Sequence, residues 1–415
     1  MIIRNISLEN FRNYGRLDLD VGPSVNIVCG NNAQGKTNLV EAISVCSCIT
    51  SHRTSKDRDL IKSGESGYKI CLEFDGSGYY GSVASLENQY LTERSPLNNS
   101  GKPRRQLKID GLLTTHTNEY LGHCNTVIFA PEDLNIVKGA PQHRRKFLNM
   151  LISKVSPSYY DLIARMNRCI IQKTALIKSY RGNDAYIRND DFDFWDITMA
   201  DLSSEIIIKR MRFVNMISKK ASEHHSVISD GREVLSVSYV GMPFYREIED
   251  HLKEKGLIEG FYAENMDENV YLEVKKLIDS YLRAAFRKSR KNDIEKGICT
   301  IGIHRDDIDI KLNGMVMRTY CSQGQQRSAA LALKLAELEI LRKHYHSSPV
   351  LLLDDVFSEL DKGRRMGLLA GMDNAQIFIT CTDREYIEKE LDSFLLKDVE
   401  PAFFRVMNGT VERES

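Results

Sequence analysis

The chain has 415 residues, of which 42% are hydrophobic and 27% are charged, a composition typical of a soluble globular protein with a sizeable core. Lys plus Arg and Asp plus Glu number 57 each, so the net charge argues neither for nor against nucleic acid as a partner. No run of about 18 apolar residues occurs, which predicts that no segment spans a membrane.

The cysteines and the N-terminus predict a cytoplasmic location. The nine cysteines are scattered, odd in number and without a C-x-x-C pair, which is typical of reduced, mostly buried thiols and argues against zinc. The first residues include Arg4 and Glu9 and contain no long apolar core, so they do not resemble a signal peptide.

The first 140 or so residues read as α/β with additional antiparallel strands. A short β-branched run at 24–30 ends in glycine and is followed by a helical pattern from about Lys36 to Cys48. Asp110-Gly111 is a hairpin turn signal. The remaining strands are expected at 2–8, 68–74, 79–86, 104–113 and 125–130.

The middle of the chain changes to helical spacing. Helices are expected at 143–155, 159–180, 199–225 and 268–293, with one strand at 234–240. A polar, acidic and aromatic segment at 181–196 is expected to be a break between the second and third helices.

The last part returns to α/β. Residues 299–314 read as strand–turn–strand, and 323–345 as a strong helix with a leucine stripe. Buried strands are expected at 350–353 and 375–380, and a terminal hairpin around Asn408-Gly409.

One segment of the α/β part carries the pattern G-x-x-x-x-G-K-T between a strand and a helix. Backbone N–H groups of such a loop surround a phosphate chain, and the helix start adds its positive end. Lys36 is expected to reach the β- and γ-phosphates of ATP, and the Thr37 hydroxyl to bind Mg²⁺. The ATP-binding residues predicted here are Gly30, Asn31, Asn32, Ala33, Gln34, Gly35, Lys36 and Thr37.

A second segment supplies carboxylates. Residues 350–353 form an apolar run that ends in Asp354 and Asp355. Asp354 is expected to bind Mg²⁺ and Asp355 to orient the attacking water, which makes Lys36, Asp354 and Asp355 the predicted catalytic residues. Asp354 lies 318 positions after Lys36 (354 minus 36), so the helical middle is an insertion between two halves of one nucleotide site.

A third segment, Ser322 to Arg327, opens the strong helix just before the acidic strand. It matches the S-x-G-Q core of the ATP-binding-cassette signature, and Ser322, Gly324 and Gln325 are expected to meet the γ-phosphate of a second subunit. ATP would then join two copies head to tail. Ser358 and Asp361 resemble the D-loop that follows, and either Thr380 or Thr382 occupies the place of the switch histidine.

Taken together, these segments resemble the RecF family of bacterial recombination and repair ATPases, relatives of the SMC heads. Blocks in family order include "LENFRNY", "GNNAQGKTNLVEAI", "SHRTSKDRDLIKSG", "FAPEDLNIVKGAPQHRRKFLN", "HRDDIDIKLNG", "YCSQGQQRSAALALKLAE" and "LLLDDVFSELD". The resemblance implies an ABC-type P-loop ATPase head built from both chain ends, at 1–141 and 293–415. A compact, mostly helical lobe at 142–292 would be inserted between them.

The resemblance also implies function. It implies ATP-dependent homodimerisation on single- and double-stranded DNA junctions and assistance to RecO and RecR in loading RecA. Ile303 stands where the family usually has proline, and Cys381 lies within the switch segment. No clear Q-loop glutamine is present, and "APEDL", with Glu132 and Asp133, holds that region. Asp355 replaces the glutamate common in ABC ATPases, which predicts slow, DNA-stimulated hydrolysis.

Local basic clusters are the candidates for contacts with DNA phosphates. They lie at 53–58, 102–108, 144–146 and 283–291, and each could equally be a solvated face or part of a structural ion pair. Arg144 and Arg145 could serve the fold instead. The residues favoured for DNA are Arg104, Arg105, Lys288 and Arg290.

Three other functions are weighed against this one. A kinase-like reading of His304-Arg305-Asp306 fails because the other kinase segments are missing. The ATPase subunit of a transporter would have a shorter insertion than the roughly 150 residues expected here. An ATP-binding switch or scaffold with negligible hydrolysis stays open, because of Asp355 and the absent glutamine.

Overall fold

The computed structural model describes residues 2–75, 77–78, 81–98, 100–181, 189–242, 244–356, 364–365, 374–385, 387 and 401–414. The chain divides into two compact units. Unit 1 contains residues 1–138, 220–234 and 321–415, and unit 2 contains residues 139–219 and 235–320. Both chain ends therefore build unit 1. The expected boundary near 141 lies close to the observed one, whereas the boundary expected at 292–293 is found at 320–321.

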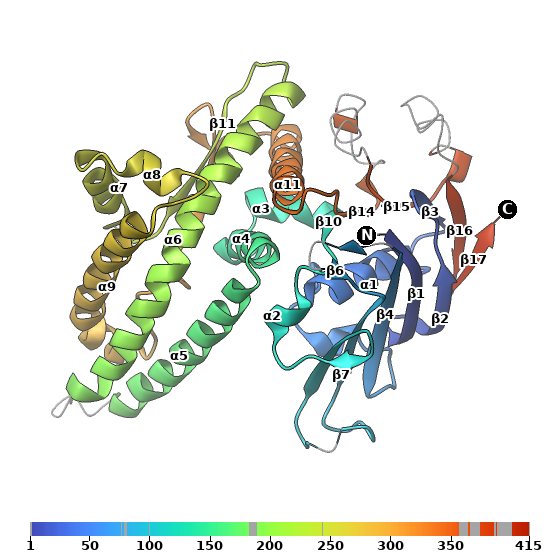
Figure 1. Cartoon of the computed structure of the whole chain (residues 1–415), viewed down its shortest axis with the longest axis horizontal. Coiled ribbons are helices and arrows are strands. Elements are labelled where there is room, and N and C mark those ends of the chain that lie inside the picture. Colours follow the sequence, from blue (N-terminus) through green and yellow to red (C-terminus); the bar gives the residue numbers. More distant parts are fainter. Residues whose placement is uncertain are drawn as a thin grey trace. The chain divides into compact units, whose positions relative to one another are not determined.

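A largely parallel sheet in unit 1 brings the two chain ends together. Strand β3 lies between β15 and β16 and is parallel to both (Figure 1). The strands, in sheet order, are β10 (Thr126–Phe129), β14 (Val350–Leu353), β15 (Ile377–Cys381), β3 (Val25–Cys29), β16 (Ala402–Met407) and the antiparallel β17 (Thr410–Glu414). β3, β10, β14 and β15 are buried along their whole length, as expected for strands covered on both faces.

A second sheet of unit 1 is antiparallel. Its strands, in order, are β2 (Tyr14–Asp20), β1 (Ile2–Phe11), β4 (Gly67–Asp75), β7 (Ser85–Leu91), β8 (Arg104–Ile109) and β9 (Leu112–Leu113). Buried and more exposed residues alternate along β4 and β7, which is the pattern of a sheet with one face in the core. The short strands β5 (Ser77–Gly78) and β6 (Gly81–Ser82) pair separately.

Helix α1 (Lys36–Cys48) lies between these two sheets. It contacts β4 and β7 of the antiparallel sheet and β10 and β15 of the parallel one. This position explains why "LVEAISVCSC" is apolar or small almost all around and buried throughout. The side chain of Gln376 joins the sheets directly, because it accepts a hydrogen bond from the Ile3 amide at 2.8 Å and donates to the Ile3 and Gly22 carbonyls at 2.7 Å.

Helix α11 (Gln323–Tyr345) covers another part of unit 1. It packs on α3 (Leu134–Lys138) and on β10. Shorter elements complete the described part of the unit: η1 (Asp57–Leu60), α2 (Thr117–Tyr120) and η2 (Pro131–Asp133). No helix in the described ranges is long and apolar enough to cross a membrane, and none of the nine cysteines forms a disulfide.

Unit 2 is mostly helical. Its helices are α4 (Pro141–Val155), α5 (Ser158–Tyr180), most of α6 (Asn189–Ile228), α7 (Phe244–Glu254), α8 (Ile258–Tyr262), α9 (Glu268–Lys296) and α10 (Met317–Tyr320). A small antiparallel sheet contains β11 (Leu235–Val240), β12 (Asp307–Leu312) and β13 (Met315–Val316). The last turns of α6, from Lys220, belong to unit 1.

Two expectations for unit 2 were wrong. The break expected through 196 ends earlier, because α6 already begins at Asn189. Asp190 and Asp191 lie in the first turn of this helix, where the positive end of the helix dipole stabilises their carboxylates. The side chains of Phe192 and Asp196 are buried. The strand expected before residue 307 does not form either, since residues 299–306 are turns and bends and only β12 pairs with β11. That pairing also explains why residues 293–320 belong to unit 2.

A buried ion pair holds the core of unit 2. Arg210 on α6 is 2% exposed and Asp306 is fully buried. Arg210 Nη1 donates to Asp306 Oδ2 at 3.0 Å and to the Ile303 carbonyl at 2.8 Å. The hydroxyls of Tyr239 and Tyr245 also donate to Asp306. The "HRDD" block is therefore structural, as the rejection of a kinase-like loop anticipated.

Replacing Asp306 tests this assignment. Asp306→Asn keeps the shape of the side chain but leaves the charge of Arg210 buried without its counter-ion, so we expect a loss of about 3–5 kcal/mol of stability. Urea unfolding followed by the fluorescence of Trp195, the single tryptophan of the chain and a residue of α6, measures it. Asp309→Asn on β12, three residues further along the chain, breaks a more exposed pair with Lys311 and is expected to cost less than about 1 kcal/mol. Equal losses in the two variants would contradict the assignment.

Candidate nucleotide-binding site

The loop between β3 and α1 has glycines where no side chain fits. A Cβ on Gly30 would lie 2.5 Å from the backbone oxygen of Val406 on the neighbouring strand β16. Gly35 has φ 127°, and a Cβ there would lie 2.7 Å from the side-chain nitrogen of Asn13. These two positions of the G-x-x-x-x-G-K-T pattern therefore require glycine for backbone reasons, independently of any ligand.

Distant segments of unit 1 support the same loop. The Gln34 carbonyl accepts hydrogen bonds from Asn13 Nδ2 at 2.7 Å and from the Gly409 amide at 3.1 Å. The Asn408 amide donates to Gln34 Oε1 at 2.6 Å. The β1–β2 turn and the tip of the C-terminal hairpin thus hold the loop, a role for Asn13 and Asn408 that no local pattern in the sequence signals.

The loop leaves donors available for an anion. Helix α1 has no side-chain cap and no acidic residue in its first turn, so its leading N–H groups and positive end face the loop. Asn31, Asn32 and Ala33 are exposed. Lys36 is 4% exposed, and its Nζ donates to the Gly30 carbonyl at 2.8 Å and to the Asn31 carbonyl at 3.2 Å. The arrangement fits a phosphate chain.

The loop meets the acidic strand end at one hydrogen bond. Thr37 Oγ1 donates to Asp354 Oδ1 at 2.9 Å, although the two residues are 317 positions apart. Thr380, at the end of β15, donates to the same oxygen at 2.9 Å. Of the two threonines considered for the switch position, Thr380 is the one that contacts the acidic residues. The structure therefore brings Thr37 and Asp354 together, and Lys36 directly precedes Thr37 at the start of α1.

Burial shifts the titration of Asp354. Asp354 is only 3% exposed, and this burial raises the pKa of its carboxyl group to about 6. The hydrogen bonds from Thr37 and Thr380 lower the pKa in part, whereas the charges of Asp355 and Glu132 raise it further. The carboxyl group is thus half-protonated near pH 6, and a cation that binds to it displaces a proton below that pH.

Asp355 has a constrained backbone. Its φ of 51° lies in the left-handed region, and its amide donates to Thr380 Oγ1 at 2.9 Å. Thr380 therefore holds both carboxylate residues. The predicted D-loop residues Ser358 and Asp361 lie outside the described residues.

The residues present fit a magnesium ion that is shared with a nucleotide. A hydroxyl and a carboxylate oxygen, on Thr37 and Asp354, are hard oxygen ligands of the kind that Mg²⁺ prefers. Within the described ranges no group of three or more His, Cys, Asp or Glu side chains could hold a metal. An ion here would therefore depend on phosphate oxygens and water for most of its ligands, as Mg²⁺ commonly does.

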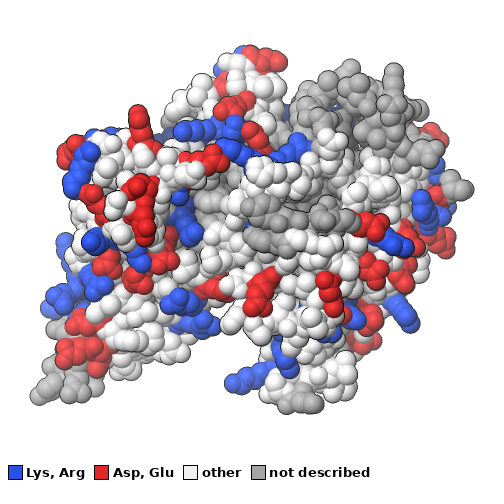
Figure 2. All heavy atoms as spheres, viewed as in Figure 1, with Lys and Arg blue, Asp and Glu red and all other residues white. Residues whose placement is uncertain are grey.

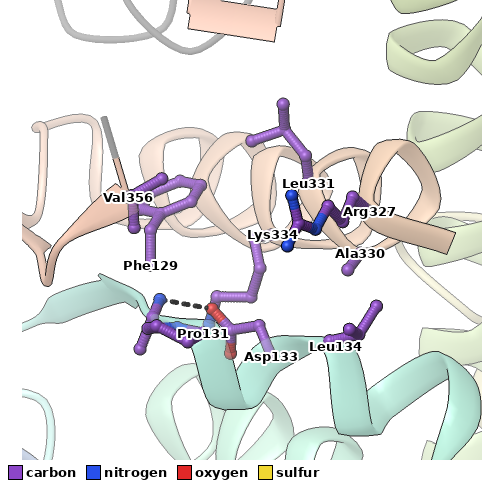
Figure 3. Close-up of a pocket in the computed structure, with 10 residues that line it drawn as sticks. Phe129, Pro131, Asp133, Leu134, Arg327, Ala330, Leu331, Lys334 and Val356 are labelled. Carbon is purple, nitrogen blue, oxygen red and sulfur yellow. Dashed lines mark hydrogen bonds between the residues drawn. The ribbon is translucent and has the colours of Figure 1, made fainter. Parts of the chain in front are cut away.

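The segment at 130–134, which the sequence analysis places in the Q-loop region, lies beside helix α11. Asp133 on η2 accepts a hydrogen bond from the Ala130 amide at 2.9 Å, and Lys334 extends from α11 toward it (Figure 3). Burial raises the pKa of Asp133 to about 6 despite the opposing charge of Lys334. Together with Phe129 and Leu331, these residues line a small pocket of unit 1.

The start of α11 is capped by the signature residues themselves. Ser322 Oγ accepts a hydrogen bond from the Gln325 amide at 3.2 Å, and Gln325 Oε1 accepts one from the Ser322 amide at 2.9 Å. Arg364 Nη2 donates to the Gly324 carbonyl at 2.9 Å. Ser322 is exposed, so its hydroxyl and the helix start remain accessible.

A network of arginines around Glu41 supports α1 and was missed by the sequence analysis. Glu41 is fully buried and accepts two hydrogen bonds from Arg12, at 2.8 and 2.9 Å, and one from Ser51. Arg53 Nη1 donates to Glu41 at 3.2 Å and to Asn38 at 2.9 Å. Arg53, which the sequence placed in a basic cluster, therefore braces the P-loop helix.

The four residues favoured for DNA separate into two groups. The side chain of Arg105 is 18% exposed and pairs with Asp57, and the side chain of Arg290 is 5% exposed and pairs with Asp193 and Asp196. Arg104 and Lys288 are exposed. Arg144 forms a two-point pair with Asp307, at 2.7 and 2.8 Å, and serves the fold. Over the described surface in Figure 2, Lys and Arg are interspersed with Asp and Glu.

The raised pKa of Asp354 predicts a pH-dependent effect of its replacement. Between an unfolded pKa of 3.8 and a folded pKa of about 6, only the folded chain holds the proton, so stability falls as the pH rises through this window. Asp354→Asn removes this dependence and keeps the oxygen that accepts from Thr37. We expect the variant to be more stable than the parent by about 2–3 kcal/mol at pH 8.

The gain is expected to shrink to about 1 kcal/mol at pH 4.5, because the folded parent then holds the proton and the unfolded chain begins to bind it as well. Calorimetric unfolding of the nucleotide-free proteins at both pH values measures it, and the shifted Asp133 cancels because both proteins contain it. A gain that is equal at the two pH values would show that Asp354 does not titrate as described.

Comparison with known proteins agrees with this geometry. Residues 2–400 match the family described as RecF/RecN/SMC N terminal domain. The DNA replication and repair protein RecF of Clostridium acetobutylicum is 34% identical over 411 residues, which cover 99% of both chains. The protein of the same name from Staphylococcus carnosus is 36% identical over 392 residues, covering 94% of this chain and 96% of the relative.

A solved structure agrees over the whole chain. The recombination mediator protein RecF-ATP in the RecFOR pathway matches with a TM-score of 0.80 at 30% identity, covering 100% of this chain and 98% of that chain. The predicted fold class, an ABC-type ATPase head from both chain ends with an inserted, mostly helical lobe, is thereby confirmed. The chain belongs to the RecF family.

Proposed function

We propose that this protein is an ATP-dependent DNA-binding protein of recombinational repair and replication restart. ATP and Mg²⁺ would bind at Lys36, Thr37 and Asp354, and the nucleotide would drive homodimerisation on single-strand/double-strand DNA junctions. The dimer would help RecO and RecR to load RecA. The names of the relatives, DNA replication and repair protein and recombination mediator protein in the RecFOR pathway, support this role.

The hydrogen bond from Thr37 to Asp354 is the observation that carries the proposal. It joins the phosphate loop to the acidic strand end, although the inserted unit separates the two in the sequence, and this contact supports a Mg²⁺–ATP site built from both segments. Lys36 would exchange its bonds to the Gly30 and Asn31 carbonyls for phosphate oxygens.

The signature residues extend the proposal to a dimer. In the ABC architecture, the S-x-G-Q helix start completes the site of a second subunit. Ser322 is exposed and fits this task, because its hydroxyl and the helix start can accept an anion brought by a partner. Two copies would thus bury two ATP molecules between them, each held by Lys36 of one copy and by Ser322 and Gly324 of the other.

DNA contacts are proposed for the exposed residues only. Arg104 on β8 and Lys288 on α9 are exposed and suited to bind phosphates. Arg105 and Arg290 are removed from this set, because their charges are already paired with buried or half-buried carboxylates.

Hydrolysis is expected to be slow. The carboxylate of Asp355 is one methylene shorter than the usual glutamate, and its backbone amide is tied to Thr380 Oγ1. This constraint also supports a second candidate function, an ATP-binding switch that dimerises without appreciable hydrolysis. Phosphate release measured with saturating gapped DNA distinguishes them, since only the first predicts turnover that DNA accelerates.

The dimer proposal predicts separate effects of two substitutions. Lys36→Ala removes the cation that binds the phosphates and is expected to abolish ATP binding and dimerisation together. Ser322→Arg places a bulky charge at the helix start, so we expect unchanged ATP binding by the monomer but at least tenfold weaker dimerisation. Sedimentation velocity with ATP–Mg²⁺ and with ADP measures the association, and a fluorescent ATP analogue measures the binding.

A parent protein that remains monomeric with ATP, both alone and with gapped DNA, would contradict the composite site. ATP binding that is lost in Ser322→Arg would indicate a damaged fold or a signature that acts on its own nucleotide.

Charge reversal tests the DNA surface. Arg104→Glu and Lys288→Glu are each expected to weaken binding to gapped DNA and to reduce the slope of log K against log salt by about one. Arg4→Glu, at an exposed position on β1, is the matched control and is expected to leave the slope unchanged. Fluorescence anisotropy over a salt series measures the slope, and equal slopes in all proteins would remove Arg104 and Lys288 from the interface.

A further inference from the structure

A chain of three hydrogen bonds leads from the signature residues into the interior of unit 1. The Ser322 amide donates to Gln325 Oε1 at 2.9 Å, and Gln325 Nε2 donates to Glu233 Oε1 at 2.8 Å. The second oxygen of Glu233 lies 3.0 Å from His225 Nε2. His225 is fully buried in the last turns of α6, and Glu233 lies just after that helix.

We infer that Glu233 and His225 are positioning residues for the ATP signature. They would hold the Gln325 side chain, and through it the start of α11, in the orientation in which Ser322 meets the γ-phosphate of a second subunit. The inference rests on the composite site of the proposed function, and it adds two residues that lie outside the signature pattern.

The direction of each hydrogen bond follows from the groups involved. An amide side chain can turn over, so its oxygen and nitrogen exchange places unless both are engaged. Glu233 is a carboxylate and only accepts, which obliges Gln325 to present Nε2 to it and Oε1 to the Ser322 amide. Without Glu233, Gln325 Nε2 would lose its acceptor, and the side chain would be held only by the hydrogen bond from the Ser322 amide to its Oε1.

His225 in turn holds Glu233. Its Nδ1 is buried and has no hydrogen-bond partner among the described residues, so a proton there would be left without an acceptor among them. A proton on Nε2 therefore fits the site, and it is donated to Glu233 Oε2. Burial opposes the ionisation of Glu233, but the hydrogen bonds from Gln325 and His225 outweigh it and lower the pKa of Glu233, which keeps the carboxylate an acceptor.

Unit 1 contains a matched pair that does not touch the signature. His224 Nε2 lies 3.0 Å from Glu339 Oε2, and Lys220 Nζ lies 2.8 Å from Glu339 Oε1. This contact also joins the end of α6 to α11, but at a residue fourteen positions after Gln325 (339 minus 325). Its loss would remove a comparable helix–helix contact and leave the cap of Ser322 intact.

The experiment compares Glu233→Ala with Glu339→Ala. We expect Glu233→Ala to weaken ATP-dependent dimerisation about tenfold, the order of magnitude of one hydrogen bond to a charged group, and Glu339→Ala to weaken it less than twofold. Sedimentation velocity with ATP–Mg²⁺ gives the dimer Kd, and a fluorescent ATP analogue gives the binding by the monomer. Both variants are expected to bind the analogue like the parent, because the P-loop is unchanged.

A double-mutant cycle separates positioning from general stability. In the Gln325→Ala background, Glu233→Ala is expected to weaken dimerisation by less than a further twofold, because the side chain it holds is already gone. Glu233→Gln, which cannot accept from both partners at once, is expected to fall between Glu233→Ala and the parent.

The outcomes distinguish this inference from the function on which it rests. If the parent dimerises with ATP and Glu233→Ala does so equally well, or weakens only as much as Glu339→Ala, the positioning role is overturned and the composite site stands. Additive effects of Glu233→Ala and Gln325→Ala would also overturn it. If the parent does not dimerise, the composite site fails and the inference fails with it.

Discussion

The hydrogen bond between Thr37 and Asp354 is the interaction on which the rest of the molecule depends. It can form only if β3 and β14 belong to one sheet, and β3 takes its own neighbours from β15 and β16 near the end of the chain. The first and last thirds must therefore fold together before a nucleotide site exists. The chain segment between them can differ in length as long as both of its ends join unit 1. Here most of that segment forms the helical unit 2.

The same constraint explains the chemistry of the site. Asp354 ends a strand that is buried on both faces, so its carboxyl group is removed from water and its pKa is raised to about 6. Until a cation binds, burial disfavours the charged form of this carboxyl group, which therefore stays partly protonated. Thr380 holds both Asp354 and Asp355 through its hydroxyl, which favours a rigid, slow site over a fast one. Rigidity of this kind suits the proposed role, in which ATP connects two copies for a limited time.

Local patterns predicted the elements that carry the candidate site. Helix α1 runs from Lys36 to Cys48, as its spacing indicated, and the glycines, Lys36, Asp354 and Ser322 were all recognisable from short motifs. Long-range ion pairs could not be recognised in this way, because no local sequence pattern around an arginine identifies its partner. Asp57 for Arg105 and Asp193 for Arg290 are examples. The pairing of β11 with β12 is another long-range contact that no local pattern signals. It explains why residues 293–320 belong to unit 2, although the sequence analysis placed them in the ATPase head. The contacts from Asn408 to the loop and from Glu233 to Gln325 could be found only in the folded chain.

The central claim is that each ATP is shared between two copies, and one mixing experiment tests it most directly. A Lys36→Ala chain keeps an intact signature but lacks a working P-loop, whereas a Ser322→Arg chain has the opposite defect. Each alone is expected to stay monomeric in sedimentation velocity with ATP–Mg²⁺, and the mixture is expected to form a heterodimer with one complete site. A mixture that stays monomeric, although the parent dimerises with ATP, would contradict the sharing of ATP between subunits.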